Sequence, residues 1–230
     1  IMAYTTIDDP SAYFKVQLWT GTGSSNAITF DDTDTDMQPD LVWIKVRSES
    51  NNHELYDSVR GTTKRIYPDL DNAEDTNTAG LTAFGSDGFT VNTSHATNKS
   101  SGTFVAWCWK AGTTSSITTN GSTTITPSAY SFNQTAGFSV LKYSGNGTSG
   151  AKLAHGLGSA PNFYITKRTD STSFWGVYHD SLTITSNYAL RLNTNGTQDA
   201  SASYWNGTVA DSVNLTLGDY VDINGSGNDY

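Results

Sequence analysis

Hydrophobic and polar residues alternate with a period of two along much of the chain. Successive side chains of a β-strand point to opposite faces of a sheet, so this alternation is typical of strands with one buried face. The alternating runs are residues 14–19, 41–47, 88–92, 103–109, 137–143, 162–168 and 188–192. The helical signal is Asp9 before Pro10, an N-cap residue type ahead of proline, and it predicts a single turn.

Residue types that favour turns dominate the composition. Thr, Ser, Asn and Gly make up 100 of the 230 residues, and Asp outnumbers Glu by 19 to 3. These residues compete for backbone hydrogen bonds or cost entropy inside helices, so helix is disfavoured. Aromatic residues form 12% of the chain, which is too many for a disordered segment. We therefore predict an all-β protein of antiparallel strands with at most short helical turns.

Several short motifs occur twice, in the same order, at offsets of 121 to 124 residues. Residues 19–23 recur as 143–147, and residues 39–44 recur as 161–165. Tyr56 and the two residues after it also recur, near Tyr178. Ordered recurrence at one offset is the signature of a repeated structural unit. The sequence thus predicts two tandem β-sandwich domains.

The predicted domain boundary follows residue 112. A Thr- and Ser-rich stretch comes next, and its Asn120-Gly121 pair indicates a hairpin, so it is interpreted as the opening strands of the second domain. We expect domains at residues 1–112 and 113–230. The first would close with the strand at 103–109, whose counterpart would begin near residue 229, so the second is expected to lack its last strand. We expect the natural chain to continue past Tyr230; a strand donated by another subunit and a different closure are the alternatives.

Charge and hydropathy exclude two classes of partner. The net charge of -9 opposes binding to nucleic acid, which requires clustered Lys and Arg. No apolar run reaches the roughly 18 residues of a membrane span, and the first residues do not resemble a signal peptide. We predict no nucleic-acid partner and no membrane insertion. The single cysteine, Cys108, excludes an internal disulfide and is expected to be a buried small hydrophobe.

Most sequence templates of catalytic sites find no match in the chain. It contains no G-x-S-x-G, no H-E-x-x-H, no P-loop and no cysteine pair for zinc, and its four histidines are dispersed. His155, beside Gly156, is interpreted as a turn residue and not as part of an oxyanion loop. With 19 Asp present, some carboxylate pair would always fit a glycosidase, so that signal carries no weight. We predict a protein that is not an enzyme.

One acidic segment resembles the start of a calcium-binding loop. Asp32, Asp34 and Asp36 alternate as ligands do in an EF-hand. Met37 stands where that loop needs Gly, however, and Trp43 stands where it needs Glu. The segment is therefore not an EF-hand. A solvated hairpin loop is the favoured interpretation, an irregular Ca²⁺ site is the alternative, and no cofactor is otherwise expected.

Two tryptophans are predicted on polar faces of their strands. In residues 14–20, Val16 and Leu18 share the face interpreted as apolar, which leaves Trp19 on the polar side. In residues 41–47, the same alternation groups Trp43 with Lys45 and Arg47.

A tryptophan on a polar sheet face can stack on a sugar ring, and neighbouring Lys and Arg can hydrogen-bond its hydroxyls or carboxylates. The candidate glycan-binding residues are Trp19, Trp43, Lys45 and Arg47. The alternative is that these tryptophans pack under a loop, against the other domain or against another subunit. The tryptophans of the strand at 103–109 are expected to be covered, because that strand carries large apolar residues on both faces.

The motifs together resemble a β-rich domain of tail-fibre-like virion proteins of tailed bacteriophages, particularly marine ones, in which it often occurs in tandem. The residues that carry the resemblance are 11–14, 19–23, 39–45, 55–61, 86–89 and 105–112, with 155–158 and 175–179 in the second half. The resemblance implies a fold similar to lectin-like jelly rolls and a role at the virion surface. It supplies no catalytic or binding residues.

These observations lead to one expected function and two alternatives. We expect a phage virion structural protein, a tail-fibre or surface adhesin component that contacts host-cell glycans. It would form a homo-oligomer, bind other virion proteins, be made in the host cytoplasm and become extracellular after lysis. The first alternative is a capsid-decorating or purely structural virion protein without a ligand. The second is a free carbohydrate-binding module or depolymerase.

Overall fold

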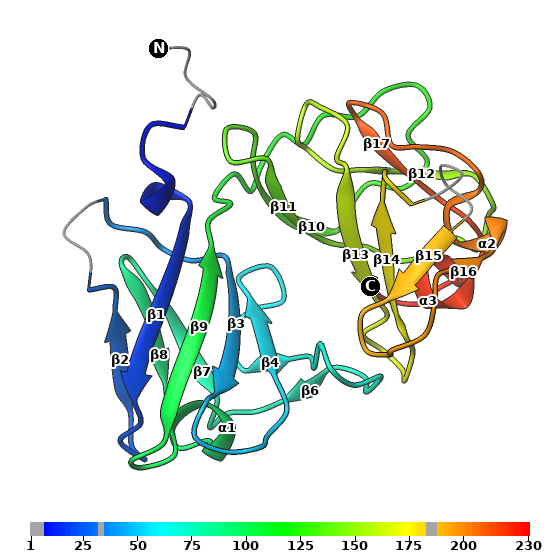
Figure 1. The fold of residues 1–230 in the computed structure, drawn as a ribbon. Coiled ribbons are helices and arrows are strands. Elements are labelled where there is room, and N and C mark those ends of the chain that lie inside the picture. Colours follow the sequence, from blue (N-terminus) through cyan, green and yellow to red (C-terminus); the bar gives the residue numbers. More distant parts are fainter. Residues whose placement is uncertain (1–6, 32–34, 183–187) are drawn as a thin grey trace. The chain divides into compact units, whose positions relative to one another are not determined.

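The computed structural model describes residues 7–31, 35–182 and 188–230 (Figure 1). Antiparallel strands account for nearly all of the secondary structure in these residues, and the helices there are single turns. The predicted all-β, sandwich-like class is confirmed. All seven alternating runs contain a strand, and Pro10–Ala12 forms the expected turn, with the Asp9 carboxylate accepting the Ser11 N–H.

The chain divides into two compact units. The first unit comprises Ile1–Tyr67, Asp75–Thr113 and Ser131–Val140, and the second comprises Pro68–Glu74, Thr114–Tyr130 and Leu141–Tyr230. Each unit thus includes a short segment from the opposite half of the sequence. The tandem origin of the two units remains a prediction.

The first unit is a sandwich of two antiparallel sheets. One sheet has the order β1(Phe14–Thr20), β9(Thr103–Trp109), β3(Leu41–Val46) and β4(Glu54–Asp57). The other has the order β2(Asn26–Thr29), β8(Gly88–Val91) and β7(Leu81–Gly85). Ile28 and Phe89 from the smaller sheet pack in one core with Ile44 and Phe104 from the larger sheet. The short pair β5(Lys64–Arg65) and β6(Asp75–Thr76) and the single-turn helix α1(His95–Asn98) complete the unit.

The second unit has a related set of elements. A sheet of order β13(Phe163–Lys167), β14(Trp175–His179), β15(Tyr188–Arg191) and β16(Asp199–Ala200) lies with the pair β12(Ala151–Ala154) and β17(Asn214–Leu217). Leu153 and Leu217 from the pair share a core with Tyr178 and Trp205. Two single-turn helices, α2(Ala202–Trp205) and α3(Val221–Asn224), complete the unit. The strands β10(Ala129–Asn133) and β11(Phe138–Lys142) pair with each other; their residues Ser131–Val140 belong to the first unit and the remainder to the second.

One turn has the same hydrogen bonds in both units, and it contains the first recurring motif. Asn98, the last residue of α1, accepts the backbone N–H of Gly23 at 2.8 Å. Asn224, the last residue of α3, accepts the backbone N–H of Gly147 at 2.8 Å. The motif at 19–23 and its recurrence at 143–147 therefore mark a loop that is fastened to a single-turn helix.

The assignment of faces in β1 was wrong. Trp19 lies against the core, stacked on Phe104 with ring centroids 5.3 Å apart, and its indole N–H donates to the Thr97 carbonyl at 3.2 Å. Val16 and Leu18 face outward and are 49% and 52% exposed. The alternation identifies residues that share a face but does not say which face is buried.

The polar residues beside Trp19 can be buried because their polar ends find partners. The Lys15 ammonium donates to the Thr35 carbonyl at 2.8 Å, and the Gln17 side-chain oxygen accepts the Asp31 N–H at 3.2 Å. The methylene groups of Lys15 and Gln17 contribute to the inner face, while these hydrogen bonds satisfy their polar end groups. The buried face of β1 therefore carries two polar side chains beside Trp19.

Candidate functional site

A group of partly exposed aromatic residues lies on the outer side of the larger sheet in the first unit. Register pairs Trp43 of β3 with Trp107 of β9 and Leu41 with Trp109, so these side chains share the face turned away from the core. The Trp43 and Trp107 rings meet edge to face, with centroids 6.4 Å apart. We call the group Trp43, His53, Trp107 and Trp109 the aromatic face.

The aromatic face forms an open, shallow depression of about 290 Å³ lined by its four residues. The Trp43 indole N–H donates to His53 Nδ1 at 2.9 Å, and the rings lie edge to face at 5.9 Å. Because this indole N–H already has an acceptor, Trp43 offers its ring surface to a ligand and not its donor. The depression therefore suits the apolar side of a flat or chair-shaped molecule.

The apolar surface continues from the aromatic face onto β1. Phe14 pairs with Trp109, and Val16 pairs with Trp107. The Phe14 ring lies 5.0 Å from Trp109, and Phe14 is 39% exposed. Contiguous exposed apolar residues of this kind mark contacts with ligands or other proteins.

The structure brings three of the four predicted glycan-binding residues together and separates the fourth. Trp43 lies in the aromatic face, and Lys45 follows it on the same side of β3, opposite Val105. The Lys45 ammonium donates to the Asn51 carbonyl at 2.5 Å, while Arg47 is exposed just after the strand. Trp19 packs into the core and takes no part in this surface.

The predicted calcium loop receives no support as a metal site. Asp32 and Asp34 lie outside the described residues, and Asp36 is exposed. Among the residues that are described, no group of three or more His, Cys, Asp or Glu side chains could hold a metal ion.

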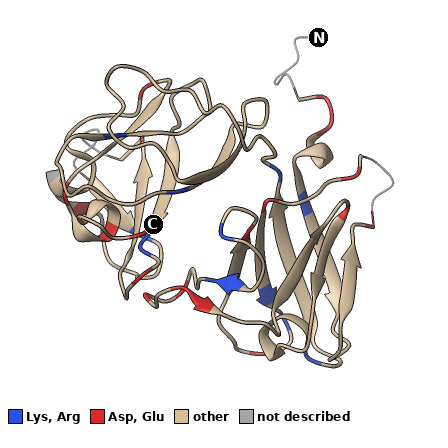
Figure 2. Ribbon diagram, turned by 180° about the vertical axis from the view of Figure 1, so that it is seen from behind, with Lys and Arg blue, Asp and Glu red and all other residues tan. Residues whose placement is uncertain are grey.

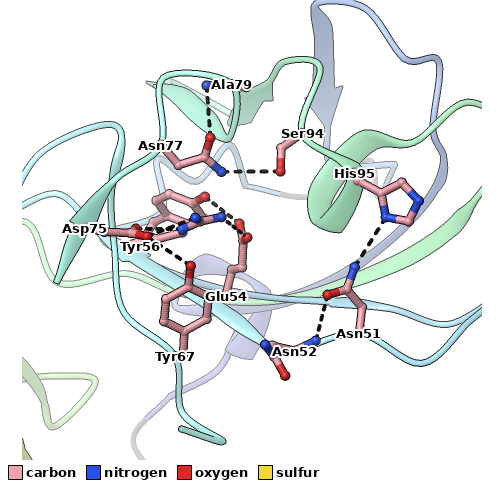
Figure 3. Close-up of polar contacts among 11 residues, drawn as sticks. Asn51, Asn52, Glu54, Tyr56, Tyr67, Asp75, Asn77, Ala79, Ser94 and His95 are labelled. Carbon is pink, nitrogen blue, oxygen red and sulfur yellow. Dashed lines mark hydrogen bonds and ion pairs between the residues drawn. The ribbon is translucent and has the colours of Figure 1, made fainter. Parts of the chain in front are cut away.

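A charged network that extends from the buried Glu54 to the exposed Asp75 joins β4 to the β5–β6 pair in the first unit (Figure 3). Figure 2 shows basic residues in blue on β5 beside acidic residues in red on β6. Glu54 is 1% exposed; one of its carboxylate oxygens accepts from Arg65 at 2.5 Å, and the other accepts from the Tyr56 hydroxyl at 2.6 Å. Arg65 also donates to Asp75 at 2.7 Å, and the Tyr67 hydroxyl donates to Asp75 at 3.1 Å.

Burial raises the pKa of Glu54 above its ordinary value, although the Tyr56 and Arg65 contacts oppose this. Burial and the neighbouring Glu54 carboxylate also raise the pKa of Tyr56. A carboxyl group with a raised pKa could serve as a general acid. Both oxygens of Glu54 have protein partners, however, so the network is best explained as a link between strands.

Two other residues with chemical potential have structural roles. His155 is 2% exposed; its Nδ1 accepts the Leu157 N–H at 3.1 Å, and its Nε2 lies 3.0 Å from the Asp211 carbonyl. Burial lowers the pKa of His155. The bond to the Leu157 N–H makes His155 a turn residue, as predicted. Cys108 is buried, and burial raises the pKa of its thiol, which opposes nucleophilic chemistry.

Lys167 is the buried cation of the second unit whose charge is most affected by its surroundings. It is 5% exposed, and its ammonium donates to the carbonyls of Asp71 and Ser173 at 3.1 and 2.9 Å. Burial lowers the pKa of Lys167 to about 8, against an ordinary value of 10.5. The neutral amine keeps two donors, so deprotonation leaves both carbonyls satisfied.

Lys167→Met should change how stability depends on pH. Between about pH 8 and about pH 10.5 the unfolded chain holds the Lys167 proton and the folded chain has lost it, so the unfolding free energy of the wild type rises with pH. The expected gain relative to Lys167→Met is on the order of 2 kcal/mol across this window. Urea unfolding of both proteins at several pH values measures it. Parallel pH profiles would contradict the lowered pKa.

No helix among the described residues is long and apolar enough to cross a membrane.

Comparison with protein families matches residues 9–230 to the family described as Domain of unknown function (DUF7483). No curated protein and no solved structure matches the chain. Because the match covers nearly the whole chain, the protein belongs to the DUF7483 family.

Proposed function

We propose that this protein is a structural component of a bacteriophage virion, a tail-fibre or surface adhesin that contacts host-cell glycans and catalyses no reaction. The observation that carries the glycan contact is the pair of partly exposed indoles, Trp43 and Trp107, on the outer side of one sheet. The virion assignment rests on the motif resemblance, which also implies other virion proteins and further copies of the chain as partners.

Sugar rings would bind through their apolar faces. A pyranose presents C–H groups on one side, which stack on indole rings, while its hydroxyls point to the rim. Lys45 lies next along β3, Arg47 follows the end of the strand, and both supply donors at that rim. The depression is shallow and open, so each site would bind weakly, and several copies in one fibre would raise the overall affinity.

The purely structural alternative is favoured by a specific feature of the same surface. Val16 and Leu18 extend the apolar area onto β1, on the far side of β9 from Trp43 and Lys45, and are about half exposed. Exposed apolar side chains of this kind suit a protein contact better than a sugar. In that case the face would pack against another virion subunit, as in a capsid-decorating protein.

Trp107→Ala should weaken glycan binding about 30-fold, which corresponds to about 2 kcal/mol for a central aromatic contact. The purified protein is first applied to a glycan array, and the affinity for the strongest ligand is then compared between variants. Phe163→Ala, which removes an exposed aromatic residue from the second unit, is the matched control and should leave binding unchanged.

Leu18→Lys separates the two candidate functions. If the face binds glycans around Trp43 and Trp107, this exposed substitution on β1 leaves glycan affinity nearly unchanged. If the face is a subunit contact, Leu18→Lys abolishes assembly. An array without any ligand, together with lost assembly in both Leu18→Lys and Trp107→Ala, would reject the adhesin proposal and favour the structural alternative.

A further inference from the structure

We propose that the edge of β13 that faces away from β14 accepts one extended peptide strand. This strand would occupy the positions directly after Tyr230 and would run antiparallel to β13. In the part of the chain that the structure describes, β13 is the terminal strand of its sheet and pairs with β14 alone. In the first unit β3 occupies the corresponding position and pairs on both edges, with β4 and β9. The second unit thus has an open edge where the first has a strand.

The first hydrogen bonds of such a strand are already present in the second unit. The Thr169 N–H, just beyond β13, donates to the Asp229 carbonyl at 2.8 Å. Tyr230 and Tyr143 exchange backbone hydrogen bonds at 2.9 and 3.1 Å, and Ser144 bridges to Asp229. Asp229 and Tyr230 therefore lie in extended pairing beside the end of β13 (Figure 1).

Equivalent hydrogen bonds lie at the start of β9 in the first unit. The Arg47 N–H, just beyond β3, donates to the Thr103 carbonyl at 2.7 Å. Trp19 pairs with Phe104 there, as Tyr143 pairs with Tyr230 in the second unit. Asp229 and Tyr230 thus correspond to the first two residues of β9, and they fix the direction in which an added strand would run.

The register of the added strand follows from these contacts. Hydrogen-bonded pairs in an antiparallel ladder recur at every second residue. With Thr169 opposite Asp229, the next pairs on β13 fall at Lys167 and then at Ile165. The first and third residues after Tyr230 would lie opposite Lys167 and Ile165. The backbone N–H groups of these two added residues would donate hydrogen bonds to the open edge of β13.

The strand β9 of the first unit indicates which side chains would fit the added strand beside β13. Ala106 and Cys108 point into the core of the first unit, while Trp107 and Trp109 point outward. In the second unit the inward side is occupied by Tyr164, whose ring stacks on Tyr178 at 4.4 Å. The Tyr164 hydroxyl oxygen is buried and has no hydrogen-bond partner among the described residues.

The occupant is therefore an apolar peptide with small inward and aromatic outward residues. A small inward hydroxyl would suit the Tyr164 oxygen, and the outward aromatic residues would cover Ile165, which is partly exposed. Peptides bind sheet edges in this way, with main-chain hydrogen bonds giving affinity and alternate side chains giving specificity. This inference does not depend on the proposed function.

The test adds the five residues Val-Ala-Trp-Ser-Trp after Tyr230, which follow residues 105–109 with serine in place of cysteine. The expected result is that amide exchange at Ile165 and Lys167 slows by about 100-fold or more, because both N–H groups become bonded. The thermal unfolding midpoint of the second unit should also rise.

The control extension is Pro-Ala-Pro-Ser-Trp, which lacks the two N–H groups that would bond the edge. It should protect neither amide and should not raise the unfolding midpoint. Equal protection in both extensions, or slow exchange at Ile165 and Lys167 in the unextended monomer, would overturn the proposal. Concentration-dependent protection in the unextended protein would instead assign the edge to a second copy of the chain.

Discussion

Gly88→Ala should unfold the first unit or destabilise it by more than about 3 kcal/mol. Gly88 has a φ of +127°, which residues with a side chain rarely adopt. A Cβ atom there would lie 2.0 Å from the Ile28 carbonyl oxygen on the neighbouring strand β2. The collision is with backbone, so a change of side-chain rotamer cannot relieve it, and the β2–β8 pairing would have to separate. Urea unfolding followed by tryptophan fluorescence and by amide exchange measures the loss.

Gly112→Ala is the matched control for Gly88→Ala. Gly112 also has a positive φ, +113°, but no heavy atom lies within 4 Å of its would-be Cβ. This variant therefore carries the backbone cost of about 1 to 2 kcal/mol without the collision. Equal destabilisation in the two variants would show that contact with Ile28 is unimportant.

Alternation identified the strands that have one buried face, and it failed for strands that are buried on both. β3 alternates between partly exposed and buried residues, and its period is plain in the sequence. β4 and β17 are buried at all four of their positions and leave no such period. In β4 this burial includes Glu54, which only its bonds to Tyr56 and Arg65 permit.

The aromatic face could be predicted only in part, because it depends on pairing between distant strands. Trp43 was expected on an outer face from its own strand. Trp107 was expected to be covered, and its position beside Trp43 follows from the register of β3 and β9. His53 joins them through the hydrogen bond from Trp43. No local pattern carries this information, since the two strands are about 60 residues apart in the chain.

A buried asparagine fastens the recurring loop in each unit. In the first unit Asn98 Nδ2 donates to the carbonyls of Ser24 and Asn92 at 2.5 and 2.8 Å, and its Oδ1 accepts the Thr22 N–H at 3.0 Å. In the second unit Asn224 Nδ2 donates to the carbonyls of Thr148 and Gly218 at 3.0 and 2.7 Å. Both asparagines are fully buried. An aspartate of the same shape would place a carboxylate oxygen against two carbonyl oxygens.

Asn98→Asp should destabilise the first unit by about 3 to 5 kcal/mol at pH 7, and Asn224→Asp should do the same to the second. Amide exchange assigned to each unit distinguishes the two effects. The folded state raises the pKa of the new acid, so the penalty is small below its unfolded pKa of about 4 and complete above its folded pKa. Asn52→Asp, at an exposed position, makes the same change in charge and should have little effect. If Asn98→Asp and Asn52→Asp are equally stable at pH 7, the two Nδ2 donors of Asn98 do not hold the loop.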